Sequence, residues 1–170
     1  YIVNVLSKAD LQIVVYHTSS ITSIRDDYKA LYDSLNIKIL GGYNINEVGK
    51  AKFVWYLYKT FRQIGSFDYL HLHYVSHYIC PIIYLFRKKF RQIILSYWGS
   101  DLLRSNKIKR RLTQPLIDTC HKISFITSDM QVTFRDYYGE GHDDKCQILD
   151  FGNLFFDKID SLKTEYSKEN

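Results

Sequence analysis

The stretch that decides the fold runs from Phe67 to Arg104 and reads FDYLHLHYVSHYICPIIYLFRKKFRQIILSYWGSDLLR. It contains two short apolar runs, Tyr69–His73 and Gln92–Tyr97, and each run ends in a polar loop that also carries aromatic residues. Between them, Ser76–Phe90 is amphipathic and long enough for a crossover helix. We interpret the stretch as a strand, a helix and a second, parallel strand. In open parallel sheets, ligands bind at the carboxyl ends of the strands.

The same alternation of strands and helices continues on both sides of this stretch. Hydrophobic periodicity predicts four more strands, at Leu11–Tyr16, Asn36–Leu40, Lys122–Thr127 and Gln147–Leu149. It also predicts four more helices, at Ser23–Ser34, Val48–Ile64, Lys107–Cys120 and Asp129–Tyr138. The order predicts an α/β fold, a Rossmann-like open parallel sheet with helices on both faces.

The composition is that of a globular domain. The 170 residues suffice for one domain with a core. No apolar run approaches the roughly 20 residues that cross a bilayer and no signal-peptide pattern occurs, so we expect a cytoplasmic protein. The scattered residues Cys80, Cys120 and Cys146 favour free, buried cysteines over a disulfide framework or a zinc site.

The formal net charge of +5 comes largely from two basic clusters. Their members are Arg87, Lys88, Lys89 and Arg91 in the first, and Lys107, Lys109, Arg110 and Arg111 in the second. Solvated helix faces are one interpretation, and attraction to an anionic membrane surface or a phosphorylated substrate is the other. We expect no nucleic-acid partner, because no helix-turn-helix, zinc finger or RNP motif accompanies the clusters.

The loop after the second strand reads Tyr97-Trp98-Gly99-Ser100-Asp101. Gly99 allows a tight turn and the close approach of a ligand. Ser100 and Asp101 can bond sugar hydroxyls or cap backbone amides, and Trp98 offers a flat apolar face for stacking on a sugar ring. A plain turn, with Trp98 in the core and Asp101 as a helix cap, is the alternative that the same residues allow.

Three histidines, His71, His73 and His77, surround the end of the first strand. His71 and His73 share one face of that strand. Two histidines could bind a metal ion, but no carboxylate or cysteine at suitable spacing completes the ligand set, so we expect no metal. We interpret His71 as a hydrogen-bonded core residue, and His73 and His77 as candidates for binding a hydroxyl or phosphate group.

A third predicted strand end, Thr127-Ser128-Asp129, repeats the polar pattern. Capping of the next helix by Ser128 or Asp129 is the stronger interpretation. Three such strand ends would nevertheless line one crevice, and this makes Ser128 a further candidate for ligand contact. The chain has no GxGxxG, GxxxxGK[ST] or GxSxG motif, which argues against a dinucleotide site, a P-loop and a hydrolase nucleophile.

The order of these pieces resembles the N-terminal domain of GT-B glycosyltransferases of family 4, also called glycosyl transferases group 1. The matching segments are Asp68–His77, Ser96–Asp101, Ile123–Ser128 and Gln147–Gly152. The resemblance covers about Leu11 to Lys163. The chain departs from the family in having Trp98 where His is common, and in lacking the glycine-containing loop after the family's first strand.

The resemblance implies the acceptor-side half of a retaining transferase that moves a sugar from a nucleotide-sugar donor to a glycan or lipid-linked acceptor. It further implies a role in bacterial surface polysaccharide synthesis, no need for a metal or other cofactor, and a location peripheral to the inner membrane. The expected acceptor contacts are His73, His77, Trp98, Gly99, Ser100, Asp101 and Ser128. The catalytic residues stay unassigned.

The resemblance also sets an expected domain organisation. Residues 1–153 would form the acceptor-side domain, and residues 154–170 would begin a linker to a donor-binding domain that the sequence lacks, so the chain alone would be inactive. Tyr1–Lys8 resembles the end of a helix, and we therefore expect a strand upstream of Tyr1. A non-enzymatic Rossmann or flavodoxin-like binding module is the alternative. An epimerase or methyltransferase is a weaker one, because the glycine-rich nucleotide loop is absent.

Overall fold

The computed structural model describes residues 14–16, 26–34, 37–40 and 45–149, and the statements below concern these residues. The chain divides into two compact units, Tyr1–Thr60 and Phe61–Asn170, which are described separately. The expectations outside the described residues are the helix end at Tyr1–Lys8, the starts of the predicted elements at Leu11, Ser23 and Asn36, and the linker at 154–170.

The first unit contains a small parallel pair of strands. Strand β1 (Val14–Tyr16) pairs with β2 (Lys38–Leu40), and helix α2 (Asp26–Ser34) connects them. Two helices follow, α3 (Ile45–Val48) and α4 (Lys50–Gln63), where one helix over Val48–Ile64 was predicted. That prediction was wrong at its start because Gly49, with a φ of +76°, interrupts the helix.

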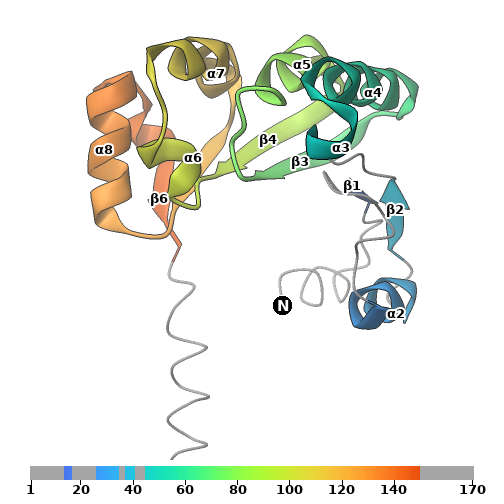
Figure 1. Cartoon of the computed structure of the whole chain (residues 1–170). Helices are drawn as coiled ribbons and strands as arrows, with labels where there is room; N and C mark the ends of the chain where they lie inside the picture. Colours follow the sequence, from blue (N-terminus) through green and yellow to red (C-terminus); the bar gives the residue numbers. More distant parts are fainter. Residues whose placement is uncertain (1–13, 17–25, 35–36, 41–44, 150–170) are drawn as a thin grey trace, which may run out of the picture. The chain divides into compact units, whose positions relative to one another are not determined.

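The second unit is built on an open sheet of four parallel strands (Figure 1). The strands lie in the order β3 (Phe67–His73), β4 (Phe90–Ser96), β5 (Lys122–Phe125) and β6 (Cys146–Ile148). The register places His73 opposite Ser96 and Ser96 opposite Ser124. Three successive residues of β5, Ile123–Phe125, are buried, so this strand is covered on both faces. The predicted open parallel α/β sheet is confirmed.

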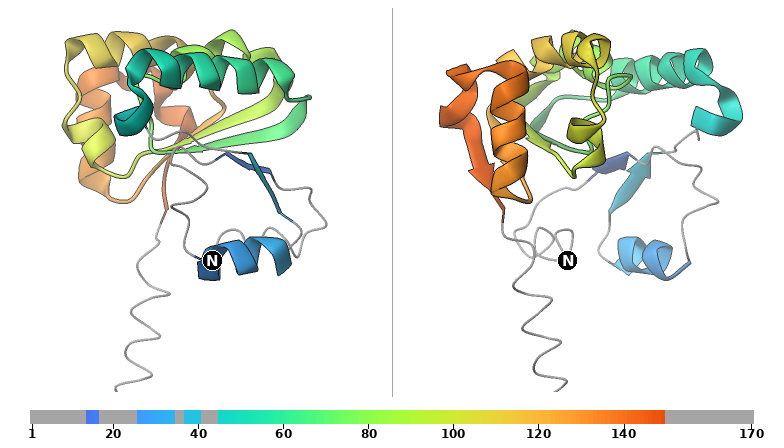
Figure 2. Two further views of the ribbon diagram at one scale, coloured as in Figure 1. Left: turned by 45° about the vertical axis from the view of Figure 1, so that its right-hand side comes forward. Right: turned by 60° about the vertical axis from the view of Figure 1, so that its left-hand side comes forward.

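Helices pack around this sheet. They are α5 (Cys80–Leu85), α6 (Ser100–Leu103), α7 (Lys107–Thr119) and α8 (Ser128–Tyr138), with 3₁₀ turns η2 (Arg87–Lys89) and η3 (Glu140–Lys145). Helices α5 and α7 pack against each other and lie over the same face of the sheet (Figure 2). Leu116 and Ile117 on the inner side of α7 are fully buried, as are Leu95 and Ile123 of the strands. Among the described residues, no helix combines the length and hydrophobicity that crossing a bilayer requires.

Two local predictions were wrong. The crossover helix was expected over Ser76–Phe90, but α5 begins only at Cys80, and Phe90 already belongs to β4. Pro81 lies at the start of α5, where its missing N–H costs no helical hydrogen bond. The cap of α8 is neither Ser128 nor Asp129, because Thr127 accepts the hydrogen bond from the backbone N–H of Met130.

The three cysteines are free. Cys80 and Cys120 are buried as expected, whereas Cys146 is only partly buried because it begins β6 at the edge of the described sheet. Burial raises the pKa of the Cys120 thiol to about 12, so this side chain is a neutral part of the core.

Candidate functional site

The loop after β3 begins with a turn that few residues adopt. Tyr74 has a φ of +71°, and among the described residues no other residue except glycine has a positive φ. Its backbone N–H donates to the carbonyl oxygen of Ser96 at 3.1 Å, which ties the turn to the end of β4. Backbone strain of this kind persists only where surrounding contacts hold it, and it is common at binding sites.

The loop after β4 turns at Gly99, which has a φ of +109°. A side chain at this φ is strained, so glycine is needed for the tight turn that the sequence predicted. The turn leaves Trp98 45% exposed, and the alternative in which Trp98 belongs to the core is therefore wrong. The indole lies beside the ring of His73, with ring centroids 6.1 Å apart.

Asp101 connects these two loops. Its Oδ2 accepts a hydrogen bond from the backbone N–H of Val75 at 2.8 Å, and its Oδ1 accepts from the backbone N–H of Trp98 at 3.0 Å. Oδ1 also accepts from Leu102 at 3.2 Å. Asp101 lies inside α6 instead of capping it, since the N-cap is Gly99. The carboxylate thus holds both strand ends in a fixed relation, and Ser100 adds a 3.4 Å bond from its Oγ to the hydroxyl of Tyr74.

The rings of His71 and His73 contact each other on one face of β3, tilted by 36° and with centroids 3.9 Å apart. His71 Nε2 lies 2.7 Å from Ser96 Oγ, which lies 2.6 Å from Ser124 Oγ, so a row of polar side chains crosses three strands. Burial, with a smaller contribution from His73, lowers the pKa of His71 to about 4. Burial also lowers the pKa of His73. The two rings are therefore neutral at pH 7 and can bond a hydroxyl group without carrying charge.

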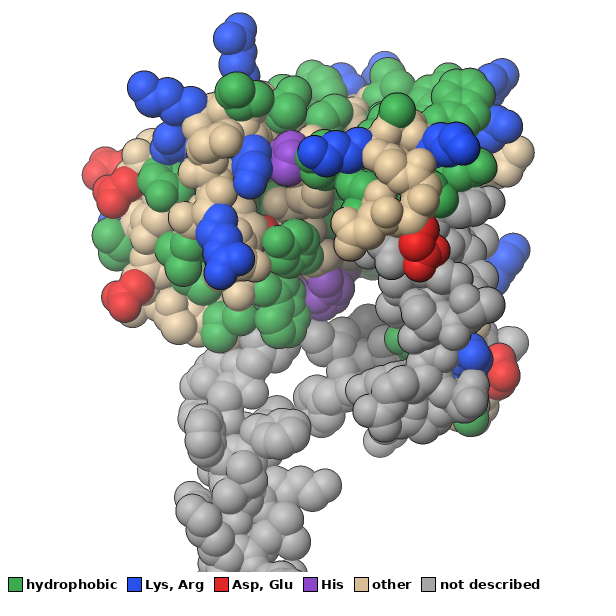
Figure 3. Space-filling view, in the orientation of Figure 1, with side chains coloured by type: hydrophobic (Ala, Val, Ile, Leu, Met, Phe, Trp, Pro, Cys, Tyr) green, Lys and Arg blue, Asp and Glu red, His purple; other side chains and the backbone are tan. Residues whose placement is uncertain are grey.

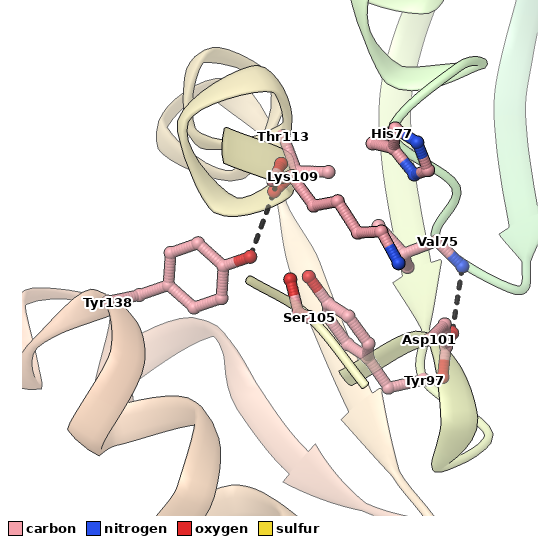
Figure 4. A pocket seen from close by; sticks show the side chains of 8 residues that line it. All are labelled: Val75, His77, Tyr97, Asp101, Ser105, Lys109, Thr113 and Tyr138. Atoms are coloured by element: carbon pink, nitrogen blue, oxygen red, sulfur yellow. Dashed lines mark hydrogen bonds between the residues drawn. The ribbon is translucent and has the colours of Figure 1, made fainter. Parts of the chain in front are cut away.

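A small polar pocket lies behind these loops (Figure 4). Side chains from both strand-end loops and from helices α6, α7 and α8 line it: Val75, His77, Tyr97, Asp101, Ser105, Lys109, Thr113 and Tyr138. Two hydrogen bonds cross its wall, from Val75 to Asp101 and between Thr113 Oγ1 and the Tyr138 hydroxyl at 2.8 Å. The pocket thus brings two of the predicted acceptor contacts, His77 and Asp101, together with Lys109 of the second basic cluster and polar side chains from more distant elements.

The family model described as glycosyl transferase 4-like matches residues 2–130. The chain belongs to this family. It is an N-terminal-type domain of a GT-B glycosyltransferase of family 4, and the partners of such an enzyme are a sugar donor and an acceptor. Neither the curated proteins nor the solved structures include a match to the chain.

The glycosyltransferase domain does not bring all predicted site residues together. His73, Trp98, Gly99, Ser100 and Asp101 meet at the ends of β3 and β4, and His77 lies in the pocket. Ser128 takes no part in these contacts: it is the exposed first residue of α8. In the described residues, no group of three or more His, Cys, Asp or Glu side chains that could hold a metal ion comes together.

The two basic clusters of the glycosyltransferase domain are divided between structural and exposed positions. Lys89 Nζ donates to the carbonyl oxygens of Phe61, Arg62 and Ile64 at the end of α4. Arg87 and Arg110 lie over the rings of Tyr84 and Tyr137, respectively, each at 4.2 Å from the centroid. Lys109 lines the pocket. The exposed members are Lys88, Arg91, Lys107 and Arg111.

Proposed function

We propose that this domain binds the acceptor in a retaining transfer of a sugar from a nucleotide-sugar donor to a glycan or lipid-linked acceptor. The observation that carries the proposal is the pair of strand ends that Asp101 joins, with Trp98 exposed beside His73. An exposed indole next to neutral imidazole rings suits a sugar, whose ring has apolar faces and hydroxyl edges. Synthesis of a bacterial surface polysaccharide is the process that the family resemblance favours.

In this role, the domain orients the acceptor and leaves the donor to another domain. A glycosyl transition state resembles an oxocarbenium ion, and the departing diphosphate needs positive charge or amide donors. Closing two domains over both substrates would exclude water and so suppress hydrolysis of the donor. We therefore propose that residues 1–153 serve as the acceptor side, that residues 154–170 begin the linker, and that a second domain holds most of the donor site.

The acceptor role is tested by measuring binding of glycans and lipid-linked sugars to the 170-residue chain. We expect binding that Trp98→Ala weakens without changing the stability of the fold. If Trp98→Ala binds every acceptor in the panel as tightly as the wild-type chain does, the acceptor-binding role is overturned. Transfer of sugar from any nucleotide sugar by the chain alone would overturn the proposed division between two domains. Failure to bind any sugar would favour a non-enzymatic binding module.

We also propose that the domain rests on an anionic membrane surface through α7. The outer side of this helix carries Ile108, 73% exposed, and Leu112, 42% exposed, next to the exposed residues Lys107 and Arg111. Figure 3 shows Lys and Arg side chains among hydrophobic ones at the edge where Figure 1 places α7. Basic residues attract anionic lipid, and each contributes about 1 kcal/mol of binding free energy near the surface. Aliphatic residues beside them insert into the membrane interface.

Vesicle sedimentation tests this contact. We expect the chain to bind vesicles that contain anionic lipid and not vesicles of neutral lipid, with binding lost in a Lys107→Glu, Arg111→Glu variant. Lys122→Glu, a charge reversal at an exposed position on β5, is the matched control. Equal binding of the wild-type chain and the α7 variant would contradict the proposal.

A further inference from the structure

The pocket contains a buried hydroxyl group without a hydrogen-bond partner. Tyr97 is 2% exposed and packs between Phe125 and Phe134, with ring centroids at 5.8 and 5.7 Å. Its hydroxyl makes no hydrogen bond with any described residue. Burial raises the pKa of Tyr97, and the nearby Tyr138 hydroxyl raises it further, but that hydroxyl pairs with Thr113 Oγ1 and meets no distance and angle criterion for a hydrogen bond with Tyr97. A phenylalanine could fill this position without the cost of an unsatisfied buried hydroxyl.

The hydroxyl lies at a pocket that can supply what it lacks. Tyr97 and Asp101 line the same small space, which has room for about one water-sized group. Burial raises the pKa of Tyr97 well above its usual value, so the group keeps its proton at every ordinary pH. It therefore offers one O–H donor to whatever enters.

A second donor comes from α7. Lys109 is partly buried, and Figure 4 shows its side chain extending from the helix toward Val75 and Tyr97. Its ammonium donates to the carbonyl oxygen of Arg104 at 3.3 Å. An ammonium has three N–H donors, so donors remain for a group in the pocket.

The pocket also has an acceptor. Asp101 Oδ2 accepts one hydrogen bond, from Val75, and a carboxylate oxygen can accept two. A hydroxyl group suits this mixture, because it can accept from Tyr97 or Lys109 and donate to Asp101. A phosphate oxygen suits it less well, because it can only accept and would face the carboxylate.

We propose that this pocket binds one hydroxyl group of the carbohydrate acceptor, with Tyr97 and Lys109 as donors and Asp101 as acceptor. The inference rests on the proposed acceptor-binding function and adds contacts at Tyr97 and Lys109. Asp101 links the pocket to Trp98, since its Oδ1 accepts from the backbone of that residue.

The test is a titration of the 170-residue chain with methyl glycosides of common hexoses, followed by NMR. We expect saturable shifts of the Lys109 and Ser105 signals, and inorganic phosphate should not compete. Tyr97→Phe and Lys109→Gln should each weaken binding about tenfold, as expected for one lost hydrogen bond. The matched controls Tyr69→Phe and Lys122→Gln, at exposed positions outside the pocket, should bind like the wild type.

Several results would overturn the proposal. They are unchanged affinity in both pocket variants, competition by phosphate, and the absence of binding by every glycoside. If Tyr97→Phe changes the stability of the fold but not glycoside binding, the pocket holds only a structural water. Failure of the proposed function would look different. If glycosides bind in the pocket but the enzyme, supplied with a donor domain, transfers no sugar, the transferase role is refuted and this inference stands.

Discussion

Asp101 Oδ2 accepts a hydrogen bond from the backbone N–H of Val75 at 2.8 Å, although 26 positions separate the two residues. The same carboxylate accepts from the backbone N–H groups of Trp98 and Leu102. One side chain thereby sets the distance between the loop after β3 and the loop after β4. The carboxylate therefore positions the two loops that carry the proposed acceptor contacts.

Replacing Asp101 should therefore destabilise the fold. Hydrogen bonds to a charged group contribute about 1.5–3 kcal/mol each, so we expect Asp101→Ala to lower the free energy of unfolding by about 2–3 kcal/mol. Urea denaturation measures this change. Asp136→Ala, at an exposed position on α8, is the control. Equal unfolding midpoints for Asp101→Ala and the wild type would show that the two loops hold their arrangement without the carboxylate.

Substitutions of the neighbouring residues Lys89 and Lys88 should affect stability differently. The Lys89 ammonium bonds three carbonyl oxygens at the end of α4, at 2.6–2.9 Å, whereas Lys88 is exposed. We expect Lys89→Met to reduce the free energy of unfolding by about 1–2 kcal/mol and Lys88→Met to change it by less than about 0.5 kcal/mol. Comparison of the two urea transitions checks this, and equal effects would refute a specific role for Lys89.

The stability of the domain should depend on pH through His71. Its pKa in the folded state is about 4, below the ordinary value of 6.5. Between these two values the unfolded chain binds the proton more readily, so stability should fall as the pH drops from 6.5 toward 4. His71→Asn keeps a polar partner for Ser96 and should flatten this part of the profile of melting temperature against pH. A variant profile as steep as that of the wild type would contradict the prediction.

Substitution of Trp98 should weaken acceptor binding without destabilising the fold. Because it is 45% exposed, we expect Trp98→Ala to shift the unfolding free energy by less than about 1 kcal/mol. Acceptor binding should weaken about tenfold or more, since stacking on an indole contributes of the order of 1–2 kcal/mol. Trp98→Phe should restore part of it. Trp55→Ala, at a position 54% exposed in the other unit, is the control, and equal binding losses in both alanine variants would refute the assignment.

Sequence patterns were sufficient where local forces decide. Helix α7 was predicted to begin at Lys107, and it does so because Asn106 caps it and Thr113, Leu116 and Ile117 form a buried stripe. The parallel strands were equally predictable from apolar runs that end in polar loops. Periodicity predicted too long a crossover helix. The segment before Pro81 forms turns, although its amphipathic pattern is the same as that of a helix.

The pocket could not be predicted in the same way. Tyr97 was predicted as the last residue of a strand and the start of the loop after it, and Lys109 as part of a basic cluster, because neither carries a local motif for a pocket. Their proximity depends on how α7 packs beside the strand ends, and such packing is decided by residues far apart in the chain. The role of Lys89 is similar, since its partners lie 25–28 positions earlier.

The paired hydroxyls of Ser96 and Ser124, 2.6 Å apart across β4 and β5, have a consequence for how the sheet assembles. Both side chains are buried, at 3% and 1% exposure, and the Ser124 hydroxyl finds its partners, Ser96 Oγ and the carbonyl oxygen of Leu95, on β4. A two-residue slip of β5 along β4 would keep apolar residues inward but leave the Ser124 hydroxyl unpaired, at a cost of about 1–3 kcal/mol, while Ser96 would keep its contact with His71. The pair therefore favours one strand register over others with similar hydrophobic burial.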